Sequence, residues 1–266
     1  MTIKRSSARP ILAKYTKTTK AVATKRGKKR GLGRPKGSGS QRVYDAIREQ
    51  ILTLRLKPGT IVDELALVSI FNLSRTPVRE ALIRLEADGL VQIVPNRGAR
   101  VAALDFENIG RLFEALDLYA RAICFLAAKR RDPETISAAR TASEDFSRAA
   151  QQKNFREMGE ANWRFHFELG RASGNSYIAD AQTRIMNETM RLAYLVHLES
   201  VKRNENYKGY FAQITDEHEK ILNYIENGNA QEAERLAGQH VGLFRDNIIR
   251  YIAQNDLNVI RVADAI

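Results

Sequence analysis

The sequence predicts a mostly α protein in two parts, a compact helix-and-hairpin unit followed by an antiparallel all-α helical bundle. Three observations lead to this fold class. Apolar residues recur at three- and four-residue spacing between residues 41 and 90, which is typical of amphipathic helices. Two short β-type runs separated by turn residues follow them. From residue 105 onward the helical spacing continues, and only short turn-forming clusters interrupt it.

The first unit, residues 41–103, is expected to begin with three helices. The first carries Val43, Ile47, Ile51 and Leu54 on its buried face and ends at Lys57-Pro58-Gly59, and the second covers about Glu64–Phe71. After a turn at Asn72–Arg75, Thr76 is the predicted N-cap and Pro77 the first helical residue of the third helix. Its buried face comprises Val78, Ala81, Leu82 and Leu85, and Gly89 ends it.

The β-type runs Leu90–Val94 and Gly98–Ala102 are joined by Pro95-Asn96-Arg97 and predict a hairpin. Helix, helix, tight turn, capped helix and hairpin is the order of a winged helix-turn-helix. In such a unit the capped helix enters the major groove of double-stranded DNA with its N-terminus first.

The exposed start of the third helix carries the predicted base contacts Arg75, Thr76 and Arg79. Arginine suits this role because it can donate two hydrogen bonds to guanine O6 and N7. The hairpin places Arg97 and Arg100 beside a DNA backbone or minor groove. The alternative is that these arginines only keep a surface helix soluble.

The run SRTPVREAL (Ser74–Leu82), followed by LEADGL and PNRG, resembles the DNA-binding domain of GntR-family transcription regulators. The resemblance covers residues 41 to about 103. It implies that Arg75, Thr76 and Arg79 contact an operator and that Gly98 lets the hairpin approach the phosphates. Leu65 is a departure, because the second helix of the family often carries an arginine at this position, so that contact is expected to be missing.

The positive charge is concentrated at the N-terminus. The formal net charge is +12, and residues 1–40 hold 13 of the 43 basic residues and no acidic one. Such a segment buries too little surface to offset its ordering entropy, so it is predicted to be a disordered basic tail. Lys28–Gly39 has a Gly-Arg-Pro core like that of an AT-hook, which binds a minor groove, and the alternative is a solvated arm attracted to phosphates.

Composition also limits where the protein acts. No stretch approaches the roughly 20 apolar residues of a membrane helix, and the start lacks the apolar core of a secretory signal. A cytoplasmic protein with no membrane partner is therefore expected, with a mitochondrial transit peptide as the alternative for the basic start. The one cysteine, Cys124, lies in an apolar helical run and is expected to be a buried thiol.

The second domain, residues 105–252, reads as about six helices with short connections, followed by a C-terminal tail at 253–266. The first of these helices is marked by Leu112, Ala115, Leu116, Tyr119, Ile123 and Leu126. The expected breaks are Asp132-Pro133, Lys153-Asn154, Ser173-Gly174-Asn175, Asn204–Asn206 and Asn227-Gly228-Asn229.

Three of the four histidines have spacing that suggests a metal site. Asn162 and His166 lie four residues apart on one helix and so share a face. His218 and His240 lie at equal distances from residue 229, so in a helical hairpin both stand about 16 Å from the turn and meet. Three imidazoles and an amide oxygen suit Zn²⁺ or another divalent transition metal. The alternative is that they are ordinary core or rim residues.

Residues 105–252 also resemble the FCD ligand-binding domain of the FadR branch of the GntR family. The resemblance implies that Asn162, His166, His218 and His240 hold a metal, and the runs FH, SGN and DEHEKI match as well. Many members have aspartate in place of Asn162, and arginine and glutamate in place of Leu116 and Ala120. The neutral amide leaves the site more positive, which favours a carboxylate effector.

Arg121, Arg164 and Arg191 are candidate effector contacts, with solvated side chains as the alternative for each. His197 falls outside the metal pattern and is expected to be packed or exposed. The leading interpretation is a homodimeric transcription regulator, in the repressor role, that binds an inverted-repeat operator and responds to a small metabolite. The alternatives are a metal-dependent enzyme and a non-specific architectural DNA-binding protein.

Overall fold

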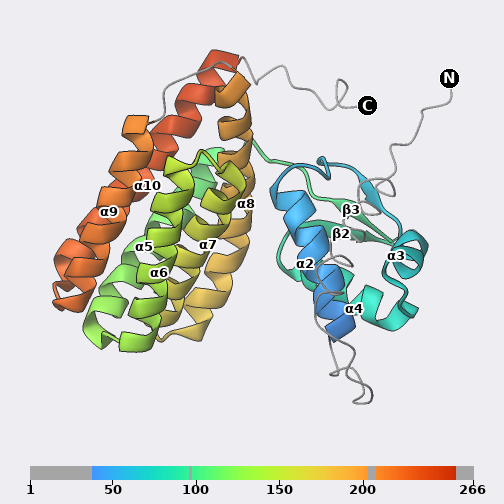
Figure 1. The fold of residues 1–266 in the computed structure, drawn as a ribbon, viewed down its shortest axis with the longest axis horizontal. Helices are drawn as coiled ribbons and strands as arrows, with labels where there is room; N and C mark the ends of the chain where they lie inside the picture. The colour runs from blue at the N-terminus through green and yellow to red at the C-terminus, as the bar shows by residue number, and fades with distance from the viewer. Residues whose placement is uncertain (1–37, 96–97, 203–207, 256–266) are drawn as a thin grey trace. The chain divides into compact units, whose positions relative to one another are not determined.

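The computed structural model describes residues 38–95, 98–202 and 208–255, which hold nine helices and three strands (Figure 1). These residues fall into two compact units that divide between Leu104 and Asp105. Most of the basic tail with its AT-hook-like segment, the break at Asn204–Asn206 and most of the C-terminal tail lie outside the described residues. None of the described helices is long and apolar enough to cross a bilayer.

The first helix, α2 (Ser38–Leu52), differs from its prediction at both ends. It begins three residues before the predicted start. Gly39 packs close to the side chain of Leu73 and Ser40 is buried, and the spacing of apolar residues does not reveal these contacts. Leu54 was wrongly assigned to its buried face. That residue lies in a left-handed turn with φ of 52°, and Leu56 is fully buried beyond the turn.

The next helix, α3 (Glu64–Phe71), has the predicted bounds. The Asp63 carboxylate caps its start by accepting a hydrogen bond from the Ala66 amide at 2.7 Å. The third helix, α4 (Arg75–Ala87), begins one residue after Ser74, so the prediction of Thr76 as N-cap is wrong. Pro77 is its third residue, and its missing N–H costs nothing there because the first four helical amides have no partner within the helix.

The predicted buried face of α4 is confirmed: Val78, Ala81, Leu82 and Leu85 are buried, and α4 packs on α2. Gly89, with φ of 73°, follows the end of the helix. The hairpin is also confirmed as β2 (Val91–Val94) and β3 (Gly98–Val101), with Val91 opposite Val101 and Val94 opposite Gly98. A third strand, β1 (Ile61–Val62), pairs with β3 and was not predicted, because two residues are too few to show an alternating pattern.

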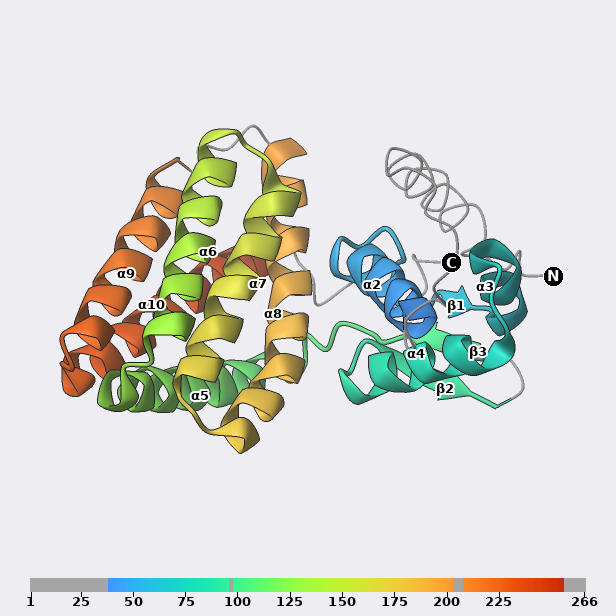
Figure 2. The ribbon, with the colours of Figure 1, turned by 60° about the horizontal axis from the view of Figure 1, so that its bottom comes forward.

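The second unit consists of six helices among the described residues, as predicted (Figures 1 and 2). They are α5 (Ile109–Arg130), α6 (Pro133–Gln151), α7 (Phe155–Ala172), α8 (Ser176–Lys202), α9 (Lys208–Glu226) and α10 (Ala230–Asn255). Helix α5 packs most extensively on α10, and α7 packs between α6 and α8. Cys124 is buried in the core between them, and burial raises the pKa of its thiol to about 12, so it is the buried thiol that was expected.

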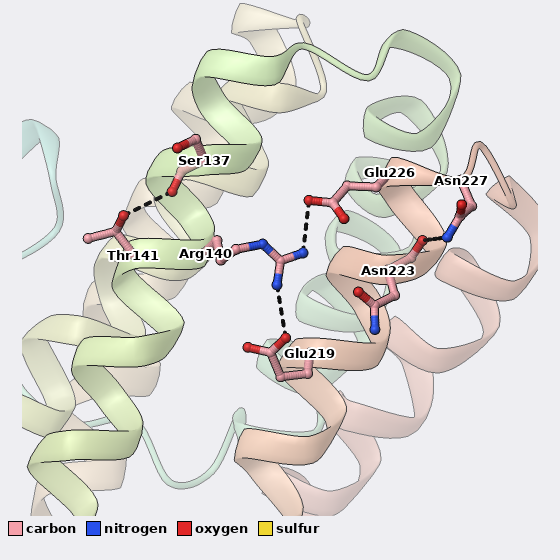
Figure 3. A network of polar contacts seen from close by, with 7 residues as sticks. All are labelled: Ser137, Arg140, Thr141, Glu219, Asn223, Glu226 and Asn227. Carbon is pink, nitrogen blue, oxygen red and sulfur yellow. Dashed lines mark hydrogen bonds and ion pairs between the residues drawn. The ribbon is translucent and has the colours of Figure 1, made fainter.

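Arg140 joins α6 to α9 on the surface of this unit (Figure 3). Its guanidinium donates to Glu219 at 2.9 Å and to Glu226 at 2.8 Å, two acidic residues about two turns apart on α9. Glu219 follows His218 directly in the chain, so this pair of bonds fixes the part of α9 that carries a predicted metal ligand.

Candidate DNA interface and metal centre

The N-terminal end of α4 presents the three predicted base contacts to solvent. Arg75, Thr76 and Arg79 are all exposed, while the opposite face of the helix is buried. The helix dipole and the arginine side chains together make this end of α4 positive, which favours contact with phosphates.

Arg79 has a partner that sequence reasoning missed. Its Nε donates to both carboxylate oxygens of Glu64 at 3.1 and 3.0 Å, so the start of α3 holds the guanidinium in place. The pair is separated by 15 residues, and only the packing of α3 on α4 brings it together. An exposed guanidinium held at its Nε keeps its terminal nitrogens available for a bidentate contact.

Arg84 lies further along α4, away from the N-terminal end of the helix. Its guanidinium stacks over the ring of Tyr44 at 4.3 Å from the ring centre and donates to Gln41 at 2.9 Å. Both partners belong to α2. The side chain is therefore engaged in holding α4 against α2.

In the hairpin, Arg100 is exposed and donates to the Gly59 carbonyl at 3.3 Å. Arg97 lies outside the described residues. Gly98 has φ of 90°, and a Cβ there would stand 2.3 Å from the carbonyl oxygen of Val62. The glycine is thus required by the packing of the hairpin on β1, a reason that the sequence did not reveal.

The three predicted metal-binding histidines converge inside the helical unit. His166 comes from α7, His218 from α9 and His240 from α10, and the candidate ligand atoms all lie within 4.8 Å of one another. Their ring centres are 4.9 to 5.6 Å apart. The meeting of His218 and His240 across the α9–α10 hairpin is the one that their equal distances from the turn predicted.

Burial keeps the imidazoles of His166 and His218 neutral. Burial and the neighbouring His240 lower the pKa of His166 to about 3. The same causes, together with His166, hold the pKa of His218 well below its ordinary value. Both ring nitrogens of His218 are buried without a hydrogen-bond partner among the described residues, while its ring stacks on Phe165 at 3.8 Å. A buried imidazole needs at least one partner, and a metal ion would supply it.

Glu217 fixes the orientation of His240. Its carboxylate lies 2.7 Å from Nδ1 of His240, and Gln213 donates to its other oxygen at 2.9 Å. Burial raises the pKa of Glu217, but these hydrogen bonds outweigh it and the net direction is downward. A carboxylate on Nδ1 leaves Nε2 of His240 free to bind a metal. Glu217 stands next to His218 in the DEHEKI run, but its position alone did not show which histidine it contacts.

A cavity opens beside the cluster and offers about 100 Å³ to the centres of water-sized atoms. His166, His240 and Asn162 line it, whereas His218 is not part of its described lining. The Oδ1 atom of Asn162 is buried without a hydrogen-bond partner among the described residues. An unpartnered amide oxygen one helical turn before His166 fits the fourth ligand that the sequence indicated.

The three candidate effector arginines are placed elsewhere. Arg121 pairs with Asp117 at 2.7 Å and Arg164 with Asp145 at 2.8 Å, both on the surface. Arg191 is buried, and burial lowers the pKa of its guanidinium to about 10 although Glu188 opposes this. None of the three belongs to the described lining of the cavity, so we do not retain them as effector contacts.

His197 is packed, one of the two placements expected for it. Its ring stacks on Phe155 and meets Phe211 edge-on, and burial lowers its pKa to about 4. The same ring lines the cavity, as do Leu116 and Ala120. Sequence spacing gave no sign that His197 shares a cavity with the other histidines, because it lies on α8, a helix outside the metal pattern.

A winged DNA-binding unit joined to a helical unit with a ligand-sized cavity defines a transcription regulator that senses a small molecule. Residues 39–101 match the family described as bacterial regulatory proteins, gntR family, and residues 111–243 match the FCD domain. The chain therefore belongs to the GntR family of transcription regulators, in the subfamily with an FCD domain.

Individual relatives agree with this family. The chain is 27% identical to LutR, an HTH-type transcriptional regulator of Bacillus subtilis, over 75% of this chain and 96% of LutR. It is 39% identical to RspR, an HTH-type transcriptional repressor of Escherichia coli, over 26% of this chain and 31% of RspR. These relatives and the matched domains are regulators, so the chain is a regulator and not an enzyme.

Among solved structures, the chain is similar in fold to McbR/YncC of Escherichia coli. The TM-score is 0.66 at 15% identity, over 82% of this chain and 98% of that one. A GntR regulator from Rhodococcus sp. RHA1 gives 0.61 at 21% identity, over 80% and 98%.

Proposed function

We propose that this regulator is a cytoplasmic repressor that binds an inverted-repeat operator as a homodimer and is released by a small carboxylate metabolite. The exposed Arg75, Thr76 and Arg79 at the start of α4 support the DNA contact. The repressor role is supported by the likeness of a 70-residue stretch of the chain to the repressor RspR. A dimer with twofold symmetry requires two half-sites with matching symmetry.

Selection of bound duplexes from a random library tests the operator. We expect an inverted repeat, bound by two chains as measured by analytical ultracentrifugation. Arg79→Ala is expected to weaken binding to the selected duplex about 10- to 100-fold while leaving binding to scrambled DNA nearly unchanged. Arg84→Ala is the matched control on the same helix, because Arg84 faces α2. Equal affinity for selected and scrambled duplexes would instead favour the non-specific architectural alternative.

The same proposal assigns a metal to the helical unit, with His166, His218 and His240 as ligands and Asn162 as the fourth. The orphaned nitrogens of His218 and the unpartnered oxygen of Asn162 carry this assignment. A bound Zn²⁺ or similar ion would supply a positive charge that binds a carboxylate oxygen. Because all four ligands are neutral, they leave the full charge of the ion available to that anion. Glu217 holds His240 in the required tautomer.

Elemental analysis of the purified full chain tests the metal. We expect about one zinc or similar ion per chain, and its loss in His218→Ala. Glu217→Gln is expected to weaken metal binding about 10- to 100-fold, because the carboxylate acts only through His240. Protein that folds normally and takes up no divalent transition metal would refute this part of the proposal and leave the DNA-binding part standing.

A further inference from the structure

Outside the ligand cluster, the wall of the cavity is mostly aromatic and aliphatic, with Gln182 and Thr189 among its polar side chains. Seven phenylalanine, tyrosine or tryptophan side chains and three methionines line it. The described lining contains no lysine, arginine, aspartate or glutamate. A ligand that fills this space meets rings and thioethers on most sides and polar groups mainly at the end with His166 and His240.

We propose that the effector is a monocarboxylate with an aromatic body of about one ring. Its carboxylate lies at the histidine end, and its ring lies among the aromatic side chains. This assignment rests on the function proposed above and narrows it to one chemical class.

The charge of the lining excludes a second acidic group. A dicarboxylate or a phosphate ester would bury an anion with no cationic side chain beside it, which is strongly unfavourable. Sugar acids are disfavoured for a related reason. Each buried hydroxyl needs a partner, no charged side chain of the described lining supplies one, and the Thr189 hydroxyl already donates to the Met186 carbonyl at 3.0 Å.

The arrangement of the rings favours an aromatic body. Phe155 stacks on His197 with an interplanar angle of 25° and meets Phe211 at 53°, so the wall offers both ring faces and ring edges. Met190 borders the same space, and its flexible thioether adapts to the shape of a ligand. The cavity offers about 100 Å³ to the centres of water-sized atoms, several times the roughly 10–15 Å³ that one water needs, so it has room for a small ligand such as benzoate.

Calorimetric titration of the zinc-loaded full chain tests the assignment with benzoate, 4-methylbenzoate, terephthalate, lactate and gluconate. We expect benzoate to bind at least about tenfold more tightly than lactate or gluconate. Terephthalate is expected to bind at least about tenfold more weakly than 4-methylbenzoate, because the two differ mainly in a second carboxylate. Fluorescence of Trp163, the only tryptophan, reports binding in the cavity that it lines.

Two cavity-filling variants locate the ring. Ala193→Leu adds bulk to the lining, and Gly159→Ala adds a methyl group that meets only the end of Met190 at 3.3 Å. At least one of them is expected to weaken benzoate binding about tenfold. Ala181→Leu makes the same change at an exposed position of α8, the helix that carries Ala193, and is expected to leave benzoate binding unchanged.

The outcomes separate the two proposals. If lactate or gluconate binds as tightly as benzoate, the aromatic assignment fails and the metal-bound carboxylate effector stands. If none of the five acids binds the zinc-loaded protein, the carboxylate effector fails as well. If benzoate binds and neither filling variant weakens it, the ring does not lie in this cavity and the inference is overturned.

Discussion

The hydrogen bonds from Arg79 to Glu64 hold the arginine side chain in place in the absence of DNA. Glu64 holds Arg79 at the start of α4 through Nε, and the same carboxylate places a negative charge close to the proposed DNA-binding surface. On this proposal the carboxylate opposes non-specific attraction to phosphates while it orients the guanidinium that would contact a base. Such a residue improves discrimination more than affinity.

Glu64→Gln is expected to raise affinity for scrambled duplex and to reduce the ratio of selected to scrambled binding about five- to tenfold. The physical reason is that a negative charge is lost and the guanidinium is held less firmly. Fluorescence anisotropy with both duplexes measures the ratio. Glu80→Gln removes the same charge from an exposed position on α4 and controls for charge alone. If both variants change the two affinities equally, Glu64 acts only through its charge.

Leu65 is a second residue at this surface whose replacement is expected to change DNA binding. It is 57% exposed, unusual for a leucine next to a buried face, and it replaces an arginine that the family often carries. Leu65→Arg is expected to strengthen binding to both duplexes and to steepen the salt dependence by about one phosphate contact. Titrations at several salt concentrations measure the slope. An unchanged slope would show that this position does not reach the DNA backbone.

At the scale of elements, the sequence predicted well where periodicity and turn residues act locally. The bounds of α3, the hairpin and the six-helix unit follow from apolar spacing and from glycine, proline and asparagine at the turns. The errors have tertiary causes. The start of α2 depends on contact with Leu73, and β1 exists because β3 pairs with it.

The candidate site divides in the same way. The helix repeat fixes the distance of His218 and His240 from their shared turn, and it places Asn162 and His166 on one face of α7. These placements were therefore predictable. The partners that come from other elements were not. Glu64 reaches Arg79 across a helix pair, and His197 reaches the cavity from α8, which no sequence interval encodes.

The contact between α6 and α9 leads to a prediction about stability. Arg140→Met keeps the aliphatic part of the side chain and removes both ion pairs with α9. Because the charged groups are partly exposed, we expect a loss of about 1 kcal/mol in the free energy of unfolding. Urea denaturation measures it, and the difference should shrink in 1 M salt, where screening is strong. A loss that does not depend on salt would mean that packing, not charge, provides the contact.

At the scale of the whole molecule, a regulator must convert occupancy of a buried cavity into a change in DNA affinity. A ligand can shift an equilibrium only by its differential affinity for the two states. The helices α7, α8 and α10 all contribute to the cavity wall, so the ligand that we propose would fix several elements at once. Burial lowers the pKa of His166 and of His197 in the same unit, and this has a cost in stability that depends on pH.

Acid is expected to destabilise the metal-free protein. Burial lowers the pKa of His197 to about 4 and that of His166 to about 3, so both stay neutral in the folded state while the unfolded chain takes up protons below pH 6.5. The unfolded state then binds more protons, and stability falls as the pH drops from about 6.5 toward these lowered values. Each such histidine costs about 1.4 kcal/mol at pH 5.5.

Urea denaturation of chelator-treated protein at pH 7.5 and 5.5 measures this cost. His197→Gln removes one titrating ring and keeps a polar side chain, so its loss of stability between the two pH values should be smaller by about 1.4 kcal/mol. Zinc added at pH 7.5 should stabilise the wild-type protein, by about 2.7 kcal/mol at 100 times its dissociation constant. That gain should shrink at pH 5.5, because protons compete with the metal for the same ring nitrogens. Equal stability of the metal-free protein at both pH values would mean that the pKa values of these imidazoles are not lowered in the folded state, so that both would be protonated at pH 5.5.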